Sequence, residues 1–598
     1  MKYQTYAFCL LTDDTGNYKM EERMAKLEIV PKNLVPSSGV TLISGVFNEA
    51  FENNMAYLKG LSQDSILYWF RKKAGKATPG EPYRGHFEDN IKGQTAGLFL
   101  MGAANTLRWE EDSQLRQRVN DIVDEIAEAT EKDGFNQPIP KSEFGTIEYP
   151  NYVRVWMNYG LIAAANVGNE KALPLVRGMQ TWFNHCDEKK IAKDLDLGYQ
   201  GVIANTSVYL SEVGEQEDVA VTVQYYQEDW WLAQLISLNP GAIHKHHRPH
   251  GTELEAITAY MDLYMITAKP LYLNAVNGAY RLFKEQWQHV GGGIVAIEHT
   301  DMEPGCQWVD PIHKYNELCC SAHWIYLNQR YHQLYPDQEE YVSEIEKSLY
   351  NIAIANQSGS EHIRYHAYLD TQKDENRETP VSCCAGLGTR LFGSLPEFLY
   401  TMSEDGVYVD IYASSEIRFR QAGNQIRLTT MTDLPVSGEV RIRLEMESPQ
   451  TFTIHLRMPS WNTESVSILV NGKFVTAGEA GSYVKLSREW AHGDTIEFVL
   501  PLEIVARLYE GKDQVKDLGR YAMKRYSFEF GALLLAVVGP LNFGGRFIRI
   551  NHDPNNPKEW MIPDPKAPGH YSILGMPNHH VVPYHEIEQE VFTCFPVF

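Results

Sequence analysis

Apolar side chains recur at helical spacing through the first two thirds of the chain. Phe47, Phe51, Met55 and Leu58 are four, four and three residues apart, which places them on one buried face of a helix. The same spacing predicts further helices over residues 115–126, 152–167, 172–184, 253–266, 271–287, 317–334, 338–356 and 386–401. Strand-like alternation is scarce in this region, so the pattern favours a ring of helices over a β/α barrel.

Near residue 404 the hydrophobic period changes from 3.6 to 2. Apolar and polar positions alternate over residues 440–446, 452–458 and 466–470. The last of these runs ends at Asn471-Gly472, a strong short signal for a β-hairpin. The pattern predicts an antiparallel β-sandwich of about 100 residues.

The sequence therefore predicts a multidomain α+β protein. Its expected parts are N-terminal strands that pack on the β-region (residues 1–44), a helical domain (45–402), a β-sandwich (403–510) and C-terminal strands and loops (511–598).

Charge and hydropathy narrow the classes of partner. The 598 residues include 77 acidic and 54 basic ones, a formal net charge of −23, and such a surface repels phosphate backbones. We therefore expect no nucleic-acid partner, and because no stretch of about 20 apolar residues occurs we expect no membrane partner. Met1–Leu11 holds one lysine and an interrupted apolar stretch, which is a poor export signal and favours a cytoplasmic location.

Cysteine is sparse but unevenly placed. Of eight cysteines, too few for a disulfide scaffold, five fall between residues 306 and 384. Glu317 with Cys319-Cys320 forms one part of this group, and Cys383-Cys384 forms another. Thiolates and a carboxylate are ordinary zinc ligands, and four of them fill a tetrahedral shell. The alternative is that the thiols are small buried hydrophobes, the usual state of a free cysteine.

Three carboxylates, Glu298, Glu303 and Glu317, follow the triple glycine at residues 291–293. Glycoside hydrolysis needs a carboxylic acid that protonates the leaving oxygen and usually a second group that attacks the anomeric carbon. The alternative for each carboxylate is a solvated position on the surface.

Four histidines, His244, His246, His247 and His250, lie within seven positions. Pro249 predicts a loop that enters the next helix. The group could bind a metal or line a polar substrate pocket, and the alternative is an exposed histidine-rich loop.

Three motifs together resemble glycoside hydrolase family 127 and its relatives, which include β-L-arabinofuranosidases. They are Glu-Leu-Cys-Cys at 317–320, the helix that ends with Glu-Lys-Ser-Leu-Tyr-Asn at 346–351, and Ser-Cys-Cys-Ala-Gly at 382–386. The segments 80–83 and 407–412 also fit the family in consistent order. The pairing of Glu-x-Cys with Cys-Cys is the specific part of the resemblance.

The resemblance implies an (α/α)6 catalytic barrel followed by a β-sandwich. It also implies a retaining mechanism in which a cysteine bound to Zn2+ is the nucleophile. Carried over by position, Cys383 is that nucleophile, and Glu317, Cys319 and Cys384 complete the metal shell.

The resemblance further implies residues that handle the sugar. Glu303 is the general acid/base, with Glu298 as its competitor. His250, Glu346 and Tyr365 line the sugar subsite.

The resulting hypothesis is a retaining exo-glycoside hydrolase that removes a terminal β-L-arabinofuranoside-like sugar from oligosaccharides. One rival is a helical-toroid uronyl hydrolase or lyase that uses His, Tyr and carboxylate chemistry. Another is a non-catalytic carbohydrate-binding protein with a structural zinc. The expected partner is an oligosaccharide substrate, and a homodimer is one assembly that the sequence allows.

Overall fold

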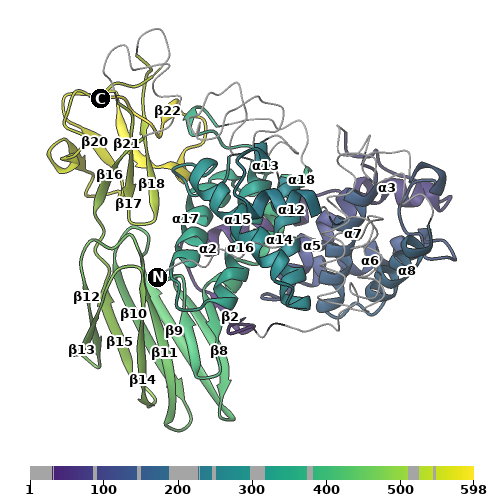
Figure 1. Ribbon diagram of the computed structural model, residues 1–598, viewed down its shortest axis with the longest axis horizontal. Helices are drawn as coiled ribbons and strands as arrows, with labels where there is room; N and C mark the ends of the chain where they lie inside the picture. The colour runs from purple at the N-terminus through teal and green to yellow at the C-terminus, as the bar shows by residue number, and fades with distance from the viewer. Residues whose placement is uncertain are drawn as a thin grey trace, which may run out of the picture.

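The fold is known from a computed structural model that describes residues 30, 32–84, 91–144, 150–186, 227, 229–244, 251–295, 317–373, 381–509, 524–542 and 547–598. Figure 1 shows the helices on one side of the molecule and two groups of strands on the other. The protein is a multidomain α+β protein, as the change of hydrophobic period predicts.

Helices dominate the described part of the first two thirds of the chain, and every segment predicted from apolar spacing contains one. The α-helices among the described residues are α2 (Val46–Gly60), α3 (Gln63–Lys73), α5 (Gln94–Leu107), α6 (Ser113–Ala129), α7 (Pro150–Asn166), α8 (Ala172–His185), α12 (Asp229–Ile236), α13 (Gly241–His244), α14 (Gly251–Thr267), α15 (Pro270–Gln286), α16 (Leu318–Leu334), α17 (Glu340–Ser348) and α18 (Cys383–Gly393). The chain continues from α17 into a π-helical segment, Leu349–Ile354.

The predicted helix over 386–401 is wrong at its C-terminal end. Helix α18 ends at Gly393, a 3-10 turn follows over Leu395–Phe398, and the strand β6 (Tyr400–Met402) comes next. Pro396 lies in the first turn of that 3-10 segment and has no backbone N–H to donate, so it could not have continued α18.

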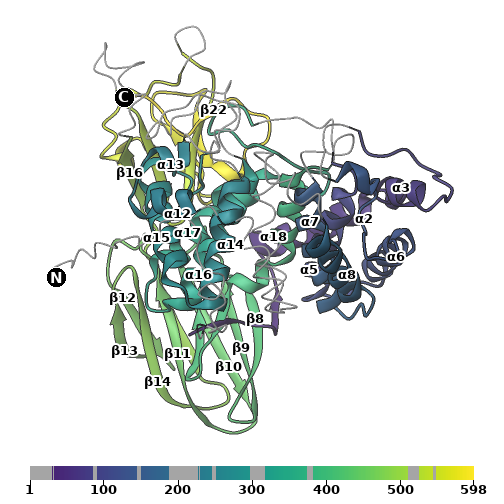
Figure 2. The ribbon, with the colours of Figure 1, turned by 45° about the vertical axis from the view of Figure 1, so that its right-hand side comes forward.

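Helix α5 is absent from the prediction for a different reason. All of its side chains are buried, so it carries no polar stripe from which a period could be read. It packs between α7 and α18, and α18 in turn packs against α16. Figure 2 shows α18 in the middle of the helical domain, with α14 and α16 on one side and α5 and α7 on the other.

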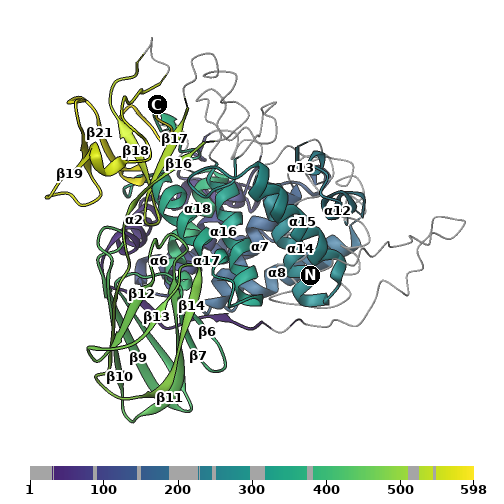
Figure 3. The ribbon, with the colours of Figure 1, turned by 60° about the vertical axis from the view of Figure 1, so that its left-hand side comes forward.

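Two sheets form a β-sandwich after the helical domain (Figure 3). The five-stranded sheet has the order β1-β6-β7-β11-β14, and the seven-stranded sheet has the order β13-β12-β15-β10-β9-β8-β2. Their strands are β1 (Val35–Pro36), β2 (Val40–Leu42), β6, β7 (Gly406–Val409), β8 (Ser415–Gln421), β9 (Asn424–Thr432), β10 (Glu439–Met446), β11 (Gln450–Met458), β12 (Val466–Val470), β13 (Lys473–Gly478), β14 (Ser482–Trp490) and β15 (Thr495–Val499). Asn471 and Gly472 both have positive φ and connect β12 to β13, which confirms the predicted hairpin.

The two N-terminal strands belong to the sandwich although the helical domain separates them from it in sequence. Strand β1 pairs with β6, and β2 pairs with β8, both antiparallel. In the sequence, strands of the same two sheets thus lie both before and after the helical domain.

A third sheet lies near the C-terminus. Its strands are β16 (Ile504–Leu508), β17 (Tyr526–Phe530), β18 (Leu533–Val538), β19 (Met561–Pro563), β20 (Tyr571–Ile573), β21 (His580–Pro583) and β22 (Phe592–Thr593), with β5 (Asp370–Thr371) paired to β22. All six side chains of β18 are buried, as its continuous apolar run suggests. Within the described residues, no helix combines the length and apolar character that crossing a membrane requires.

A buried arginine joins the helical domain to the sandwich. Arg457 of β11 is fully buried, its Nε lies 2.7 Å from Oε1 of Glu339, and its Nη2 lies 2.9 Å from Oε2 of Glu346. Trp461 donates a hydrogen bond to the same oxygen of Glu346, and Ser343 donates one to Glu339. We call these five residues the Arg457 cluster.

Candidate metal and active site

Three cysteines and one glutamate come together where helices begin. Glu317 is the N-cap of α16 and Cys319 lies in its first turn, whereas Cys383 and Cys384 are the first two residues of α18. The Ser382 hydroxyl accepts a hydrogen bond from the backbone N–H of Ala385, which fixes the start of α18. We call Glu317, Cys319, Cys383 and Cys384 the cysteine cluster.

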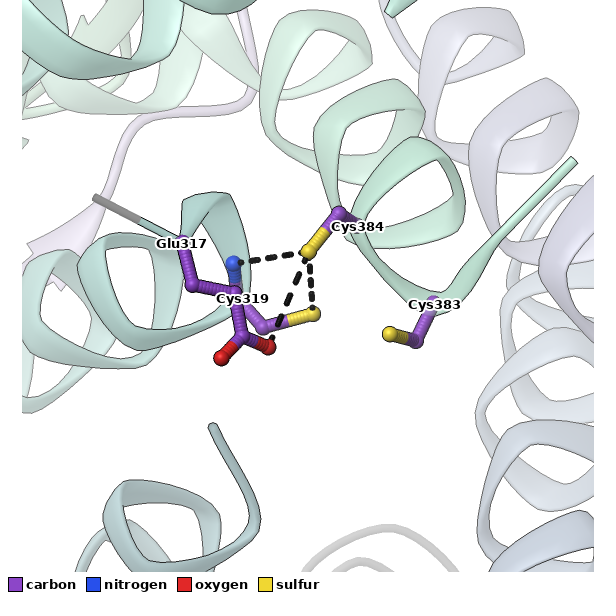
Figure 4. Close-up of side chains that lie close together, drawn as sticks. All are labelled: Glu317, Cys319, Cys383 and Cys384. Carbon is purple, nitrogen blue, oxygen red and sulfur yellow. Dashed lines mark hydrogen bonds between the residues drawn. The ribbon is translucent and has the colours of Figure 1, made fainter. Parts of the chain in front are cut away.

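The four side chains converge closely enough to share one ion (Figure 4). One ligand atom from each residue lies within 4.8 Å of the others, and all four residues are buried. The Sγ of Cys384 lies 3.1 Å from the Sγ of Cys319 and 3.7 Å from Oε1 of Glu317. The backbone N–H of Cys319 also donates to the Cys384 sulfur, at 3.4 Å.

A third helix begins at the cluster, because α14 starts with Gly251. A Cβ at Gly251 would lie 2.6 Å from the Cβ of Cys319 and 3.5 Å from Oε1 of Glu317. Only glycine therefore allows α14 to approach this closely. The N-terminal ends of α14, α16 and α18 carry partial positive charge, which favours anionic ligand atoms at the point where they meet.

Two thiols of the cluster, those of Cys319 and Cys384, resist ionisation in these surroundings. Burial raises the pKa of Cys319 well above its usual value, and its contacts with Cys383 and Cys384 raise it further. Burial likewise raises the pKa of Cys384, and the charges of Cys383 and Glu317 add to that effect. A cation placed among these groups would lower the pKa of the thiols, because metal binding displaces the protons from its ligands.

The donor set fits a tetrahedral divalent metal. With Zn–S bonds of about 2.3 Å, tetrahedral sulfurs lie about 3.8 Å apart, so the Cys384 and Cys319 sulfurs, now 3.1 Å apart, would need to separate slightly to hold the ion. Three sulfurs and one carboxylate oxygen are also the ligand types that zinc takes. This buried Glu/Cys cluster could therefore bind a metal, as predicted from the sequence.

Tyr365 lies beside the cluster. The Cys383 thiol donates to the Tyr365 hydroxyl at 3.5 Å, and the Tyr365 carbonyl accepts from the backbone N–H of Leu318. Cys320, whose role the sequence leaves open, has its Sγ 3.9 Å from Oε2 of Glu317, whereas Cys384 lies near Oε1.

Glu255 is a buried carboxyl near the cluster that the sequence analysis missed. It lies on α14 one turn after Gly251 and is 1% exposed. Burial raises its pKa to about 8, with Arg390 opposing the shift and Cys383 adding to it. Its position one helical turn from the start of α14 was the available signal, but nothing in the sequence shows that α14 faces the cysteines.

Glu346 is held in the Arg457 cluster, on the side of α17 that meets the sandwich. Its carboxylate accepts hydrogen bonds from Arg457 and Trp461 rather than from the cysteine cluster. A sugar-binding role for Glu346 stays a prediction from the resemblance. Glu298, Glu303 and His250, like Cys306, lie outside the described residues, so their predicted roles also stay predictions.

Comparison with known proteins defines the class of protein. The model of the GH127 β-L-arabinofuranosidase catalytic domain matches residues 39–397, and the model of the GH127 middle domain matches residues 406–502. Both models describe one family of glycoside hydrolases. More narrowly, the chain belongs to the β-L-arabinofuranosidase family GH127, which confirms the resemblance drawn from its motifs.

Individual relatives agree with this family. The chain is 25% identical over 232 residues to a non-reducing end β-L-arabinofuranosidase of Bifidobacterium longum subsp. longum, a match that covers 35% of this chain and 34% of that protein. The match thus spans about a third of the relative's length.

Two solved structures share the fold. A GH127 β-L-arabinofuranosidase from Geobacillus stearothermophilus T6 superposes with a TM-score of 0.71 at 16% identity, covering 93% of this chain and 99% of that one. A second GH127 β-arabinofuranosidase gives a TM-score of 0.72 at 16% identity, covering 94% and 98%.

Proposed function

We propose that the protein is a retaining exo-glycosidase that removes a terminal β-L-arabinofuranosyl residue from oligosaccharides, with Cys383 as the nucleophile. The observation that carries the proposal is the convergence of Glu317 and three cysteines at the start of two helices of a GH127 catalytic domain. For the helical domain we retain the (α/α)6 barrel implied by the resemblance. Cytoplasmic location and homodimeric assembly stay predictions from the sequence.

We assign Zn2+ to the cysteine cluster, held by Glu317, Cys319, Cys383 and Cys384. When bound, zinc keeps a coordinating thiol in its thiolate form at neutral pH. The dipoles of three helix starts act in the same direction, because each favours negative charge on the thiols.

The residues then divide the reaction into two steps. The Cys383 thiolate attacks the anomeric carbon, forming a C–S bond as the bond to the leaving oxygen breaks, and Glu303 protonates that oxygen. In the second step Glu303 takes a proton from water, whose oxygen displaces the sulfur and restores the thiolate. Glu298 remains the competitor for the acid/base role.

Tyr365 is placed to orient the nucleophile. Its hydroxyl accepts from the Cys383 thiol in the free protein. Once the thiol has lost its proton, the Tyr365 hydroxyl can turn and donate to the sulfur or to the sugar ring. His250 and Glu346 complete the proposed sugar subsite.

Metal analysis, a thiol count and a glycoside assay test the proposal together. We expect one zinc per chain, protection of Cys319, Cys383 and Cys384 from alkylation until chelation, and hydrolysis of 4-nitrophenyl β-L-arabinofuranoside with retention at the anomeric carbon. A metal-free protein with reactive thiols would contradict the cysteine nucleophile. One zinc per chain without turnover of any glycoside would instead indicate a purely structural metal.

A further inference from the structure

Glu255 lies in the interior of the helical domain, close to the cysteine cluster. Gly251 and Glu255 are four residues apart on α14 and so lie on the same face of the helix. That face is directed at the cluster, because a Cβ at Gly251 would lie 2.6 Å from the Cβ of Cys319. The charge of Cys383 also acts on the Glu255 carboxyl.

Both carboxyl oxygens of Glu255 are buried and neither has a hydrogen-bond partner. Arg390 of α18 is near enough to affect the pKa of Glu255, but no hydrogen bond joins the two side chains. The Arg390 guanidinium instead stacks on Tyr326 and Tyr159, 4.2 and 4.7 Å from the ring centroids. Arg390 also lines a cavity of about 500 Å³ together with Arg330 and Asp262.

Glu339 is an example of a buried carboxylate with a structural role in this protein. Glu339 is 2% exposed and accepts hydrogen bonds from Arg457, Ser343 and the backbone N–H of Ser460. Buried carboxyls are nearly always satisfied in this way, and one that is not costs stability. Glu255 has no such partner among the described residues, and a hydroxyl of a bound ligand would supply one.

We propose that Glu255 binds a hydroxyl group of the sugar residue that is attached to Cys383 during turnover. The inference rests on the proposed function, because the sugar must occupy the space beside Cys383. The ligand chemistry is that of a sugar ring, whose hydroxyls both donate to and accept from a carboxyl group. Glu255 is thus a substrate-binding residue in addition to those implied by the family resemblance.

Two substitutions and one control test this assignment in the zinc-loaded full chain. Glu255→Leu removes both oxygens at similar volume, and Glu255→Gln keeps the shape and one acceptor. We expect kcat/KM for 4-nitrophenyl β-L-arabinofuranoside to fall about 100-fold in the first and about 10-fold in the second, because a site built to bind a hydroxyl loses discrimination without its polar group. Zinc content stays at the wild-type value in both.

The melting temperature distinguishes a sugar-binding role of Glu255 from a structural role. Because Glu255→Leu removes an unsatisfied buried group, we expect its melting temperature to stay the same or rise by about 1–2 °C. The control Glu339→Leu removes one of the two carboxylates that pair with Arg457, so it should melt several degrees lower than the wild type. Loss of activity in Glu255→Leu together with a lower melting temperature or lost zinc would overturn the proposal, as would kcat/KM within threefold of wild type.

A binding assay keeps this inference distinct from the proposed function. If the wild type does not hydrolyse the arabinofuranoside, thermal shifts are measured with a panel of methyl pentofuranosides and methyl hexopyranosides. The inference predicts that one of them stabilises the wild type and fails to stabilise Glu255→Leu. If none stabilises the wild type, or if both proteins respond equally, Glu255 does not bind a sugar hydroxyl.

Discussion

The Arg457 cluster and the cysteine cluster bury acidic groups in opposite ways. In the first, the carboxylates of Glu339 and Glu346 both bond to one arginine and accept further hydrogen bonds from neighbours. In the second, thiols and a carboxylate face one another, and both described pKa shifts of its thiols are upward. In the Arg457 cluster the buried charges pair with one another within the chain. In the cysteine cluster, ionisation of the thiols becomes favourable when a cation is added.

This difference separates a structural role from a functional one. Satisfied buried charges join the helical domain to the sandwich and fix their geometry, and of the Arg457 cluster only Glu346 is also predicted to bind the sugar. Buried thiols whose described pKa values are raised, set beside a carboxylate, can instead bind a metal and act on a substrate. The two clusters therefore predict opposite results of mutation, which the following experiments compare.

The largest effect is expected for Cys383→Ser. The hydroxyl of serine is a far weaker nucleophile and a poorer metal ligand than a thiolate, so kcat should fall by about 10³-fold or more. The measurement is steady-state hydrolysis of 4-nitrophenyl β-L-arabinofuranoside at equal zinc content. Cys594→Ala, a buried thiol at the C-terminal sheet, serves as the control and should keep its kcat. Retained activity in Cys383→Ser would favour a mechanism based on carboxylates, histidine or tyrosine.

The next effect concerns stability. Arg457→Met leaves Glu339 and Glu346 buried without their cation, and we expect unfolding to become easier by about 3–5 kcal/mol. Urea denaturation measures this change, and Arg441→Met on the exposed side of the sandwich is the matched control, with an effect within about 0.5 kcal/mol. If Arg457→Met instead lost activity at unchanged stability, the Arg457 cluster would belong to the active site, and the sugar-binding role predicted for Glu346 would gain support.

The smallest effect is expected at Glu529, a carboxylate of the C-terminal sheet that pairs with Lys347 and Arg507. Burial disfavours ionisation of Glu529, but Lys347 and Arg507 outweigh it and lower the pKa of this carboxyl. A lowered pKa in the folded state adds stability above the unfolded value of about 4.3, and that stability is lost as the pH falls.

Wild type should therefore lose about 1 kcal/mol more than Glu529→Gln between pH 6 and pH 3.5, a modest value because Arg507 is exposed. Urea denaturation of both proteins across this range provides the measurement. Parallel pH profiles would show that this ion pair contributes nothing.

Much of the fold could be predicted from local pattern. The helices α6 and α15 each carry an apolar stripe, and the β12–β13 hairpin follows from Asn471-Gly472. Helix α5 escaped prediction because full burial removes the contrast between its faces. The end of α18 was misplaced because apolar residues continue across Gly393 and Pro396 into a strand.

Part of the candidate site could also be predicted, because some of its residues are indicated by their type and their position in the sequence. Cysteine and glutamate at 317–320 and 383–384 indicate a possible metal site by residue type and by resemblance, and the structure brings Glu317, Cys319, Cys383 and Cys384 together as a group that could hold an ion. Glu255 could not be predicted in this way, because its significance lies in the absence of a partner, which only the packing of α14 reveals. Glu346 shows the converse, since an arginine 111 residues later in the chain holds its carboxylate.

Strands β1 and β2 have a practical consequence for dissecting the protein. They precede the helical domain, but their hydrogen-bonding partners β6 and β8 follow it. A fragment that ends at α18 would carry these strands without their partners, and a fragment that begins at β6 would expose the edges that they cover. We therefore expect neither fragment to behave as an autonomous unit, so expression of the catalytic part alone is a poor route to a well-behaved enzyme.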